Sequence, residues 1–357
     1  MSAACQLIPP IDAPAARRIA SAGVSLIVLT VLAFLAQGPT VAEADDACDR
    51  FAAVSGSDTA NGTFNRPFAT PQRLVDSLSP GETGCMREGT YRGHAVFRTG
   101  GLADERKALQ SFPGERAKIA GQVRVLESAA FVTIRTLDLD GSTAPRCGAA
   151  TTCSVQASPW IQGDDTVVSD NDITNQNAGI CVLVGTSGRS PAERTAFEYN
   201  RVHHCGRRPW GNLDHGFYLE NATDTRIERN LIHDNVDRGV QLYPSSTGTV
   251  IRNNVLDGNG ENVHFGGSSS DNRIEGNVIT NARIRHNVES FASTDTRNTV
   301  RRNCVWGAPA PVLLPPRASS RLRSASRRTT TSSPIPGTWT ARTGTSGSAT
   351  KAPAERC

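Results

Sequence analysis

The amino-acid sequence predicts an all-β protein, a right-handed parallel β-helix with a short N-terminal capping helix. The 357-residue chain contains 32 glycines, two methionines and 5% aromatic residues, a composition that favours short strands and turns over a helical bundle. A ten-residue phrase recurs six times, and a second short apolar segment lies between successive copies. Repeats of this length are typical of solenoids, in which each coil stacks on the next.

The six copies align without gaps, and each places an asparagine between two apolar residues. They are TVVSDNDITN at 166–175, TAFEYNRVHH at 195–204, TRIERNLIHD at 225–234, TVIRNNVLDG at 249–258, NRIEGNVITN at 272–281 and NTVRRNCVWG at 298–307. A unit of 23–30 residues cannot bury its apolar face alone, so we expect the copies to stack around one core. We also expect each asparagine to adopt the left-handed conformation at a tight corner, and the stacked amides to hydrogen-bond from coil to coil.

Residues 1–44 have the features of a secretory signal peptide. Arg17 and Arg18 precede an apolar run at 22–36, and Ala42-Glu43-Ala44 follows as a cleavage site. An uncleaved anchor is the alternative, but the run is shorter than the roughly 20 residues that span a bilayer. Cleavage predicts a secreted, extracellular protein without stable membrane insertion. In that compartment cysteines form disulfides, and the expected pairs are Cys48–Cys85, Cys147–Cys153 and Cys181–Cys205.

The segment from 50 to 95 resembles a known N-terminal cap. It contains Pro67-Phe68-Ala69-Thr70, a predicted helix near 71–78 with Thr70 as its N-cap, and then Gly81-Glu82-Thr83 and Gly89-Thr90-Tyr91. These phrases resemble the cap of secreted bacterial right-handed β-helix repeat proteins of the pectate-lyase-like superfamily. The resemblance implies a cap at 45–83 and a β-helix at 84–306. It does not specify an activity, because this architecture carries lyases, hydrolases, epimerases and adhesins.

Residues 307–357 form a low-complexity tail rich in Pro, Arg, Ser and Thr. Its composition is typical of disorder. A frameshift after Cys304 is the other hypothesis, because a neighbouring reading frame permits a phrase that resembles the end of many secreted β-helix proteins. The whole chain has a net charge of +4, and the tail has eight basic residues and one acidic residue. Residues 1–306 therefore have a net charge of −3. The body therefore lacks the basic excess of a nucleic-acid-binding protein.

The second strands of four consecutive repeats predict where chemistry can occur. If Phe217, Val240, Val263 and Val288 point inward, period-two alternation places Tyr218, Gln241, His264 and Glu289 outward in one column. A long turn at 203–214 interrupts the regular coil beside this column and contains Arg207 and Trp210. Inserted turns of this kind can wall a binding groove.

These residues favour a polysaccharide as the partner of a protein that we expect to be monomeric. A lyase that cleaves a uronic-acid polymer needs a base for the C5 proton and a cation for the carboxylate. The catalytic candidates are His215 as base, Arg238 as neutralising cation, His264 and Tyr218, and the substrate-binding candidates are Arg207, Trp210, Gln241 and Tyr243. A non-catalytic surface or glycan-binding β-helix is the alternative.

Two other chemistries are less well supported. Glycoside hydrolysis needs two carboxylates, for which Asp214, Asp237, Glu220 and Glu289 are candidates. No spacing predicts a metal site, since His203 and His204 lack a third ligand. Calcium remains open, because Asp214, Asp234 and Asp237 could supply oxygen ligands.

Overall fold

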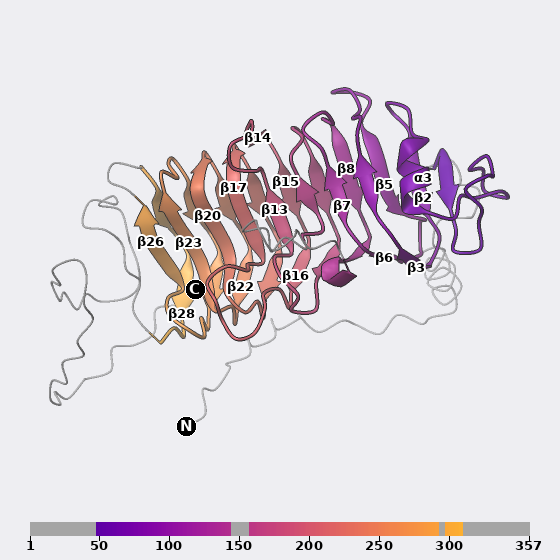
Figure 1. Cartoon of the computed structure of the whole chain (residues 1–357). Helices are drawn as coiled ribbons and strands as arrows, with labels where there is room; N and C mark the ends of the chain where they lie inside the picture. Colours follow the sequence, from indigo (N-terminus) through magenta and orange to yellow (C-terminus); the bar gives the residue numbers. More distant parts are fainter. Residues whose placement is uncertain (1–47, 144–156, 293–296, 310–357) are drawn as a thin grey trace, which may run out of the picture.

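The computed structural model describes residues 48–143, 157–292 and 297–309. Here the chain coils into a right-handed parallel β-helix, and every strand pairs in parallel with its counterpart one coil away. Figure 1 shows the coils stacked in one row, with α3 (Pro71–Asp76) at the N-terminal end and β26 and β28 at the other. The predicted fold class is confirmed.

Three sheets form the walls of the solenoid. The first sheet comprises β1 (Arg50–Ala52), β2 (Thr83–Met86), β5 (Lys107–Ser111), β8 (Val132–Arg135), β11 (Val167–Ser169), β15 (Ala196–Glu198), β18 (Arg226–Glu228), β21 (Val250–Arg252), β24 (Arg273–Glu275) and β27 (Thr299–Arg301). The second sheet comprises β4 (Ala95–Phe97), β7 (Val123–Val125), β10 (Trp160–Ile161), β13 (Val182–Val184), β17 (Phe217–Thr223), β20 (Arg238–Thr247), β23 (Glu261–Gly267) and β26 (Val288–Ala292), with β14 (Ala192–Glu193) paired to β17. The third sheet comprises β3 (Gly89–Arg92), β6 (Ala117–Ala120), β9 (Asp138–Asp140), β12 (Asp172–Thr174), β16 (Arg201–His203), β19 (Leu231–His233), β22 (Val255–Asp257), β25 (Val278–Thr280) and β28 (Cys304–Trp306), and a 3₁₀ turn, η1 (Gly141–Thr143), follows β9.

The N-terminal helix is short and closes one end of the core. Thr70 is its N-cap, and its side chain accepts a hydrogen bond from the backbone N–H of Arg73 at 3.2 Å. Leu74 and Val75 are buried against the first coil and belong to the same apolar cluster as the strand interiors. Covering this end protects the strand edges and the apolar core from water.

The asparagine ladder runs through the coils as expected, but the corner conformation was predicted for the wrong residue. The Asn230 side chain accepts the backbone N–H of Asn200 at 2.8 Å and donates to the Asn254 side chain at 3.0 Å. The residue before each ladder asparagine has the positive φ, as at Tyr199 (58°) and Arg229 (57°). The physical reason is that the ladder amide must point into the coil, so the preceding, more exposed residue makes the turn.

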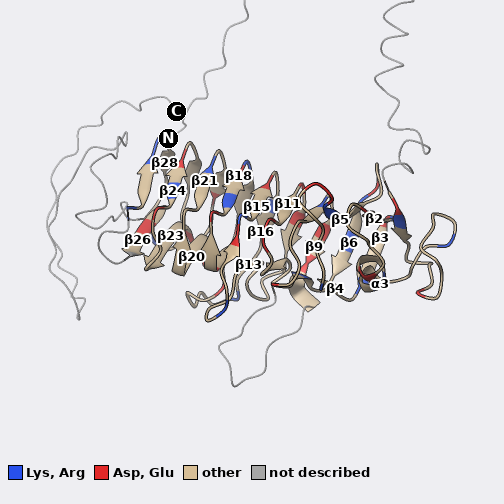
Figure 2. Ribbon diagram, turned by 90° about the horizontal axis from the view of Figure 1, so that it is seen from above, with Lys and Arg blue, Asp and Glu red and all other residues tan. Residues whose placement is uncertain are grey.

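Two of the three expected disulfides, Cys48–Cys85 and Cys181–Cys205, are present. The expected Cys147–Cys153 pair, the signal peptide at 1–44 and the tail from residue 310 lie outside the described residues. Within the described ranges, no helix is long and apolar enough to cross a membrane. Figure 2 shows basic and acidic residues interspersed along the solenoid, as expected for a body without a large charge excess.

Candidate functional site

The outward column predicted on the second sheet is present in register. Tyr218 pairs with Gln241, Gln241 with His264, and His264 with Glu289. The matching inward residues, from Phe217 on β17 to Val288 on β26, are fully buried in the core. Parallel strands stack about 4.8 Å apart. Side chains from neighbouring coils therefore lie within reach of one small ligand.

The 203–214 turn is fixed against this column by a buried carboxylate. Asp237 accepts hydrogen bonds from the backbone N–H groups of Leu213 and Asp214, both at 2.8 Å. Burial raises the pKa of Asp237, and these N–H donors oppose the rise. Arg207 forms an ion pair with Asp214 at 2.6 Å, so its guanidinium braces the turn. Neither Asp214 nor Asp237 therefore has the free oxygens that a calcium ion would need.

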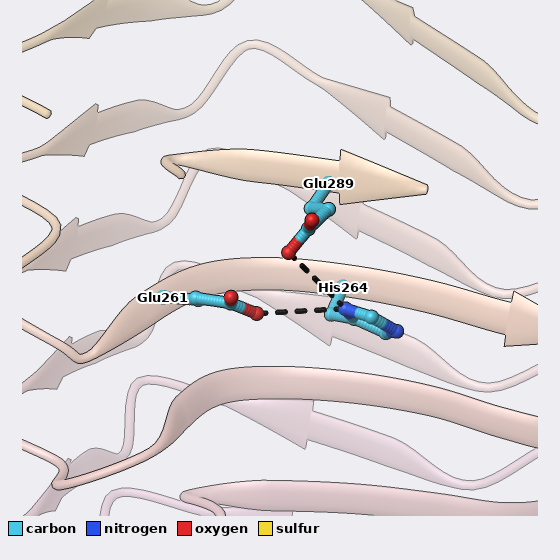
Figure 3. A group of neighbouring side chains, drawn as sticks. All are labelled: Glu261, His264 and Glu289. Carbon is cyan, nitrogen blue, oxygen red and sulfur yellow. Dashed lines mark ion pairs between the residues drawn. The ribbon is translucent and has the colours of Figure 1, made fainter. Parts of the chain in front are cut away.

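A charged cluster, defined here as Arg238, Glu261, His264, Arg285 and Glu289, lies on the outward side of β20, β23 and β26. Figure 3 shows three of its members, Glu261, His264 and Glu289. Arg238 Nε lies 2.9 Å from Glu261 Oε2, and both side chains are buried. Arg285 bridges the two carboxylates, with Nε on Glu261 and Nη2 2.7 Å from Glu289 Oε2. His264 Nδ1 points between the carboxylates, 3.5 Å from Glu261 and 3.8 Å from Glu289.

The balance of charges keeps Glu261 ionised. Burial alone would raise the pKa of this carboxyl, but the proximity of His264, the hydrogen bond from Arg285 and the charge of Arg238 outweigh it, and the pKa falls below its usual range. Burial lowers the pKa of Arg238, and the negative charge of Glu261 opposes this fall. The two arginines of the cluster match its two glutamates in charge.

His215 and Tyr218 lie beside the charged cluster, and burial shifts their pKa values in opposite directions. His215 is buried, and desolvation, followed by repulsion from Arg238, lowers its pKa well below 6.5. Its Nδ1 has no hydrogen-bond partner within the described residues. Burial raises the pKa of Tyr218, whose ring meets that of His215 edge-on with centroids 5.4 Å apart. At neutral pH, His215 is therefore an unprotonated base and Tyr218 keeps its proton.

An aromatic rim, defined as Trp210, Tyr243 and Phe291, lies above the charged cluster. These side chains are 38%, 44% and 61% exposed. Phe291 stacks on the His264 ring at 5.5 Å, and the Arg285 guanidinium lies 5.9 Å from the Trp210 ring and 5.8 Å from that of Phe291. Arg285 is 35% exposed, so it connects the buried carboxylates with solvent at the rim.

Space for a ligand lies beside two residues of this region, His264 and Trp210. At Gly266, a Cβ would lie 3.3 Å from His264 Nε2 and 3.4 Å from the Tyr243 ring, so the missing side chain leaves space beside this nitrogen. A shallow pocket of about 290 Å³ adjoins Trp210 and is lined by Arg208, Pro209, Trp210, Val236, Arg283 and Ile284. Its mixture of an aromatic ring, apolar side chains and arginines suits a sugar that carries negative charge.

The cluster also contains a possible metal-ligand set. One ligand atom each from Glu261, His264 and Glu289 can be chosen so that all lie within 4.8 Å of one another. Calcium prefers six to eight oxygen ligands, whereas this set has one nitrogen and two carboxylates already bound to arginines. The donor set therefore does not fit calcium.

The structure brings the eight predicted site residues to one stretch of the solenoid but gives them different surroundings. His215, Tyr218, Arg238, Gln241 and His264 line the column, with Arg238 donating to Gln241 at 2.8 Å. Sequence reasoning missed Glu261, although its in-register partner is Arg238 and extending the alignment two residues toward the N-terminus would have found it. Arg285 precedes β26 in an irregular segment and has no repeat signal.

The family model described as right handed beta helix region matches residues 160–314, which agrees with the fold seen in the structure. The class of protein is therefore that of right-handed parallel β-helices. No curated protein matches the sequence.

Several solved structures are similar to this chain at low identity. The alginate lyase from Paenibacillus sp. str. FPU-7 is 12% identical, with a TM-score of 0.48, covering 68% of this chain and 95% of the other. XylC in complex with xylose is 11% identical, with a TM-score of 0.48 and coverage of 72% and 69%. The pectate lyase Pel9A is 15% identical, with a TM-score of 0.49 and coverage of 72% and 70%. Likenesses at this level do not assign chemistry, which must be argued from the site.

Proposed function

We propose that this protein is an extracellular polysaccharide lyase that acts on a polymer containing uronic acid. The observation that carries the proposal is the charged cluster, which holds His264 against two carboxylates beneath an exposed aromatic rim. Buried ion pairs are costly to form and rarely add stability, so a cluster of this kind on the outer face of a sheet supports a functional role.

The geometry suits β-elimination. In this reaction a base removes the C5 proton, the electron pair forms the C4–C5 double bond, and the O4 leaving group departs with a proton from water. His264 is the base in this proposal, because its Nδ1 lies 3.5 Å from Glu261 Oε2, without a hydrogen-bond partner among the described residues, while its Nε2 lies beside Gly266. Arg285 neutralises the uronate carboxylate, because it is the arginine of the cluster that reaches the rim.

The pair first suggested by the sequence, His215 with Arg238, takes a supporting part in this scheme. Arg238 is committed to Glu261 and Gln241, so it holds the carboxylate that lies beside His264. His215 remains neutral and is the alternative base. Arg207 braces the turn that carries Trp210, and Trp210 and Tyr243 are the sugar-binding surfaces.

Elimination agrees with the charges better than hydrolysis does. A glycosidase needs one protonated carboxyl group as general acid. The lowered pKa of Glu261 keeps that group ionised, and its partners Arg238 and Arg285 would oppose protonation. A non-catalytic glycan-binding protein is the second candidate, because the exposed rim of Trp210, Tyr243 and Phe291 would serve a binder equally well.

Formation of unsaturated product, followed by its absorbance, tests the proposal on polygalacturonate, alginate and hyaluronan with and without calcium. We expect turnover on one of these polymers without a calcium requirement, and a 10²- to 10⁴-fold loss in His264→Asn, roughly the contribution of a positioned base. His233→Asn on the third sheet is the matched control. If His215→Ala loses turnover and His264→Asn does not, the base is His215. Binding without turnover on every polymer would establish the glycan-binding alternative.

A further inference from the structure

The outward column of the second sheet continues beyond the charged cluster toward the N-terminus. Tyr218 pairs in register with Leu183, Leu183 with Trp160, and Trp160 with Arg124. Leu183 is buried, and Trp160 and Tyr218 pack against the small apolar cluster to which it belongs. The column therefore presents an apolar stretch between two polar ends, with Arg124 at the far end.

Arg124 is a half-buried cation beside an aromatic ring. Its guanidinium lies 3.9 Å from the centre of the Trp160 ring, and its Nε donates to Gln162 at 2.8 Å. The pKa of Arg124 is lowered by burial and then by the nearby positive charge of Arg189. In the portion of the chain that the structure describes, no carboxylate pairs with either arginine.

Several half-exposed arginines of the solenoid are neutralised by a carboxylate. Arg116 pairs with Asp138 at 2.7 Å, Arg201 with Asp172 at 2.5 Å, and Arg301 with Glu275 at 2.6 Å, each across neighbouring coils. The positive charges of Arg124 and Arg189 instead repel one another, and Arg124 is also partly buried. Such an arrangement is relieved when an anion binds between or beside the two guanidinium groups.

We propose that Arg124, Trp160 and Arg189 form a remote subsite for a negatively charged sugar unit of the polymer. This inference rests on the proposed function and deepens it, because it assigns a polyanionic chain bound along the column. Trp160 supplies a ring for the apolar face of the sugar, and the arginines hold its carboxylate. Arg124 and His264 are five strand steps apart, or about 24 Å at ~4.8 Å per step.

The test compares binding of uronic-acid oligosaccharides of three and ten units, derived from polygalacturonate, alginate and hyaluronan. Calorimetry is done in the His264→Asn background, so that no probe is consumed. Arg124→Gln should weaken binding of the ten-unit probe roughly 5- to 20-fold, the effect of losing one charge-assisted contact. Binding of the three-unit probe at the charged cluster should not change, because that probe is too short to reach Arg124.

Matched variants separate this role from general charge effects. Arg92→Gln removes the same charge from an exposed position on the third sheet and should not alter binding. Arg124→Lys should restore part of the affinity, and Arg189→Gln should reproduce part of the loss. The Arg124→Gln protein should be about as stable as the parent, because the lost repulsion from Arg189 offsets the lost contacts with Trp160 and Gln162.

The outcomes separate the subsite from the lyase activity. If the wild-type protein cleaves a uronan and the Arg124→Gln variant binds the ten-unit probe normally, the subsite is overturned and the proposed lyase activity stands. A length-dependent loss in Arg124→Gln without any cleavage by wild type would support the subsite and reject the lyase. The subsite is also overturned if no anionic probe binds, or if Arg92→Gln has the same effect.

Discussion

Glu261→Gln is the most informative perturbation of the charged cluster. Glu261 is fully buried and is the ion-pair partner of Arg238, which is itself 3% exposed. Glutamine has nearly the same shape, so the substitution removes the charge with little change in packing. Arg238 would then be left buried without its counter-charge, which costs on the order of 3–5 kcal/mol.

The expected loss can be measured as the free energy of unfolding by urea denaturation at pH 7. Glu289→Gln is the matched control, because Arg285, its partner at 2.7 Å, is partly exposed and keeps its contact with Glu261. We therefore expect the control to lose much less stability. A loss below about 1 kcal/mol in Glu261→Gln, with the fold retained, would refute the view that Glu261 neutralises Arg238.

The same variant has a pH signature. The pKa of Glu261 is lowered from its ordinary value of 4.5, so below that pH the unfolded chain takes up a proton that the folded chain refuses. The contribution of Glu261 is therefore complete above about pH 4.5 and is lost as the pH falls further. Glu261→Gln should show a shallower loss of stability in acid than the wild type, and equal slopes would contradict the assigned charge state.

Three further predictions concern His215, Asn230 and Gly266. The pKa of His215 lies well below 6.5, so below pH 6.5 the unfolded chain binds a proton that the folded chain does not, and the stability should fall. In a series of denaturation experiments at different pH values, His215→Gln should reduce this fall. An unchanged dependence on pH would mean that His215 is charged in the folded protein. Asn230→Ala leaves two buried backbone groups, the N–H of Asn200 and the carbonyl of Phe197, without their hydrogen-bond partner. The free energy of unfolding should therefore fall by about 2–6 kcal/mol. A fall of less than about 1 kcal/mol would mean that the ladder contributes little to stability. Gly266→Ala places a methyl group beside His264 Nε2 and should lower turnover roughly 10- to 100-fold with little change in melting temperature; full activity would move the reacting atom away from His264.

The agreement between sequence and structure is best where one coil repeats the next. In a parallel stack, copies aligned in sequence are also neighbours in space, because every strand pairs in register with the one before it. The column of Tyr218, Gln241, His264 and Glu289 could therefore be predicted from alternation alone. The Cys48–Cys85 and Cys181–Cys205 disulfides were also predicted from the sequence, and both are present in the structure.

The sequence by itself determined the fold, the inward core and the face on which the candidate site lies, since these follow from periods of two residues and of one coil. Only the tertiary structure decided how the charges are paired. Alignment places a Cα atom but not the end of a long side chain, so it could not show that Arg238 turns to Glu261 rather than toward a ligand. Nor could it place Arg285, which reaches both carboxylates from an irregular segment whose path depends on packing between coils.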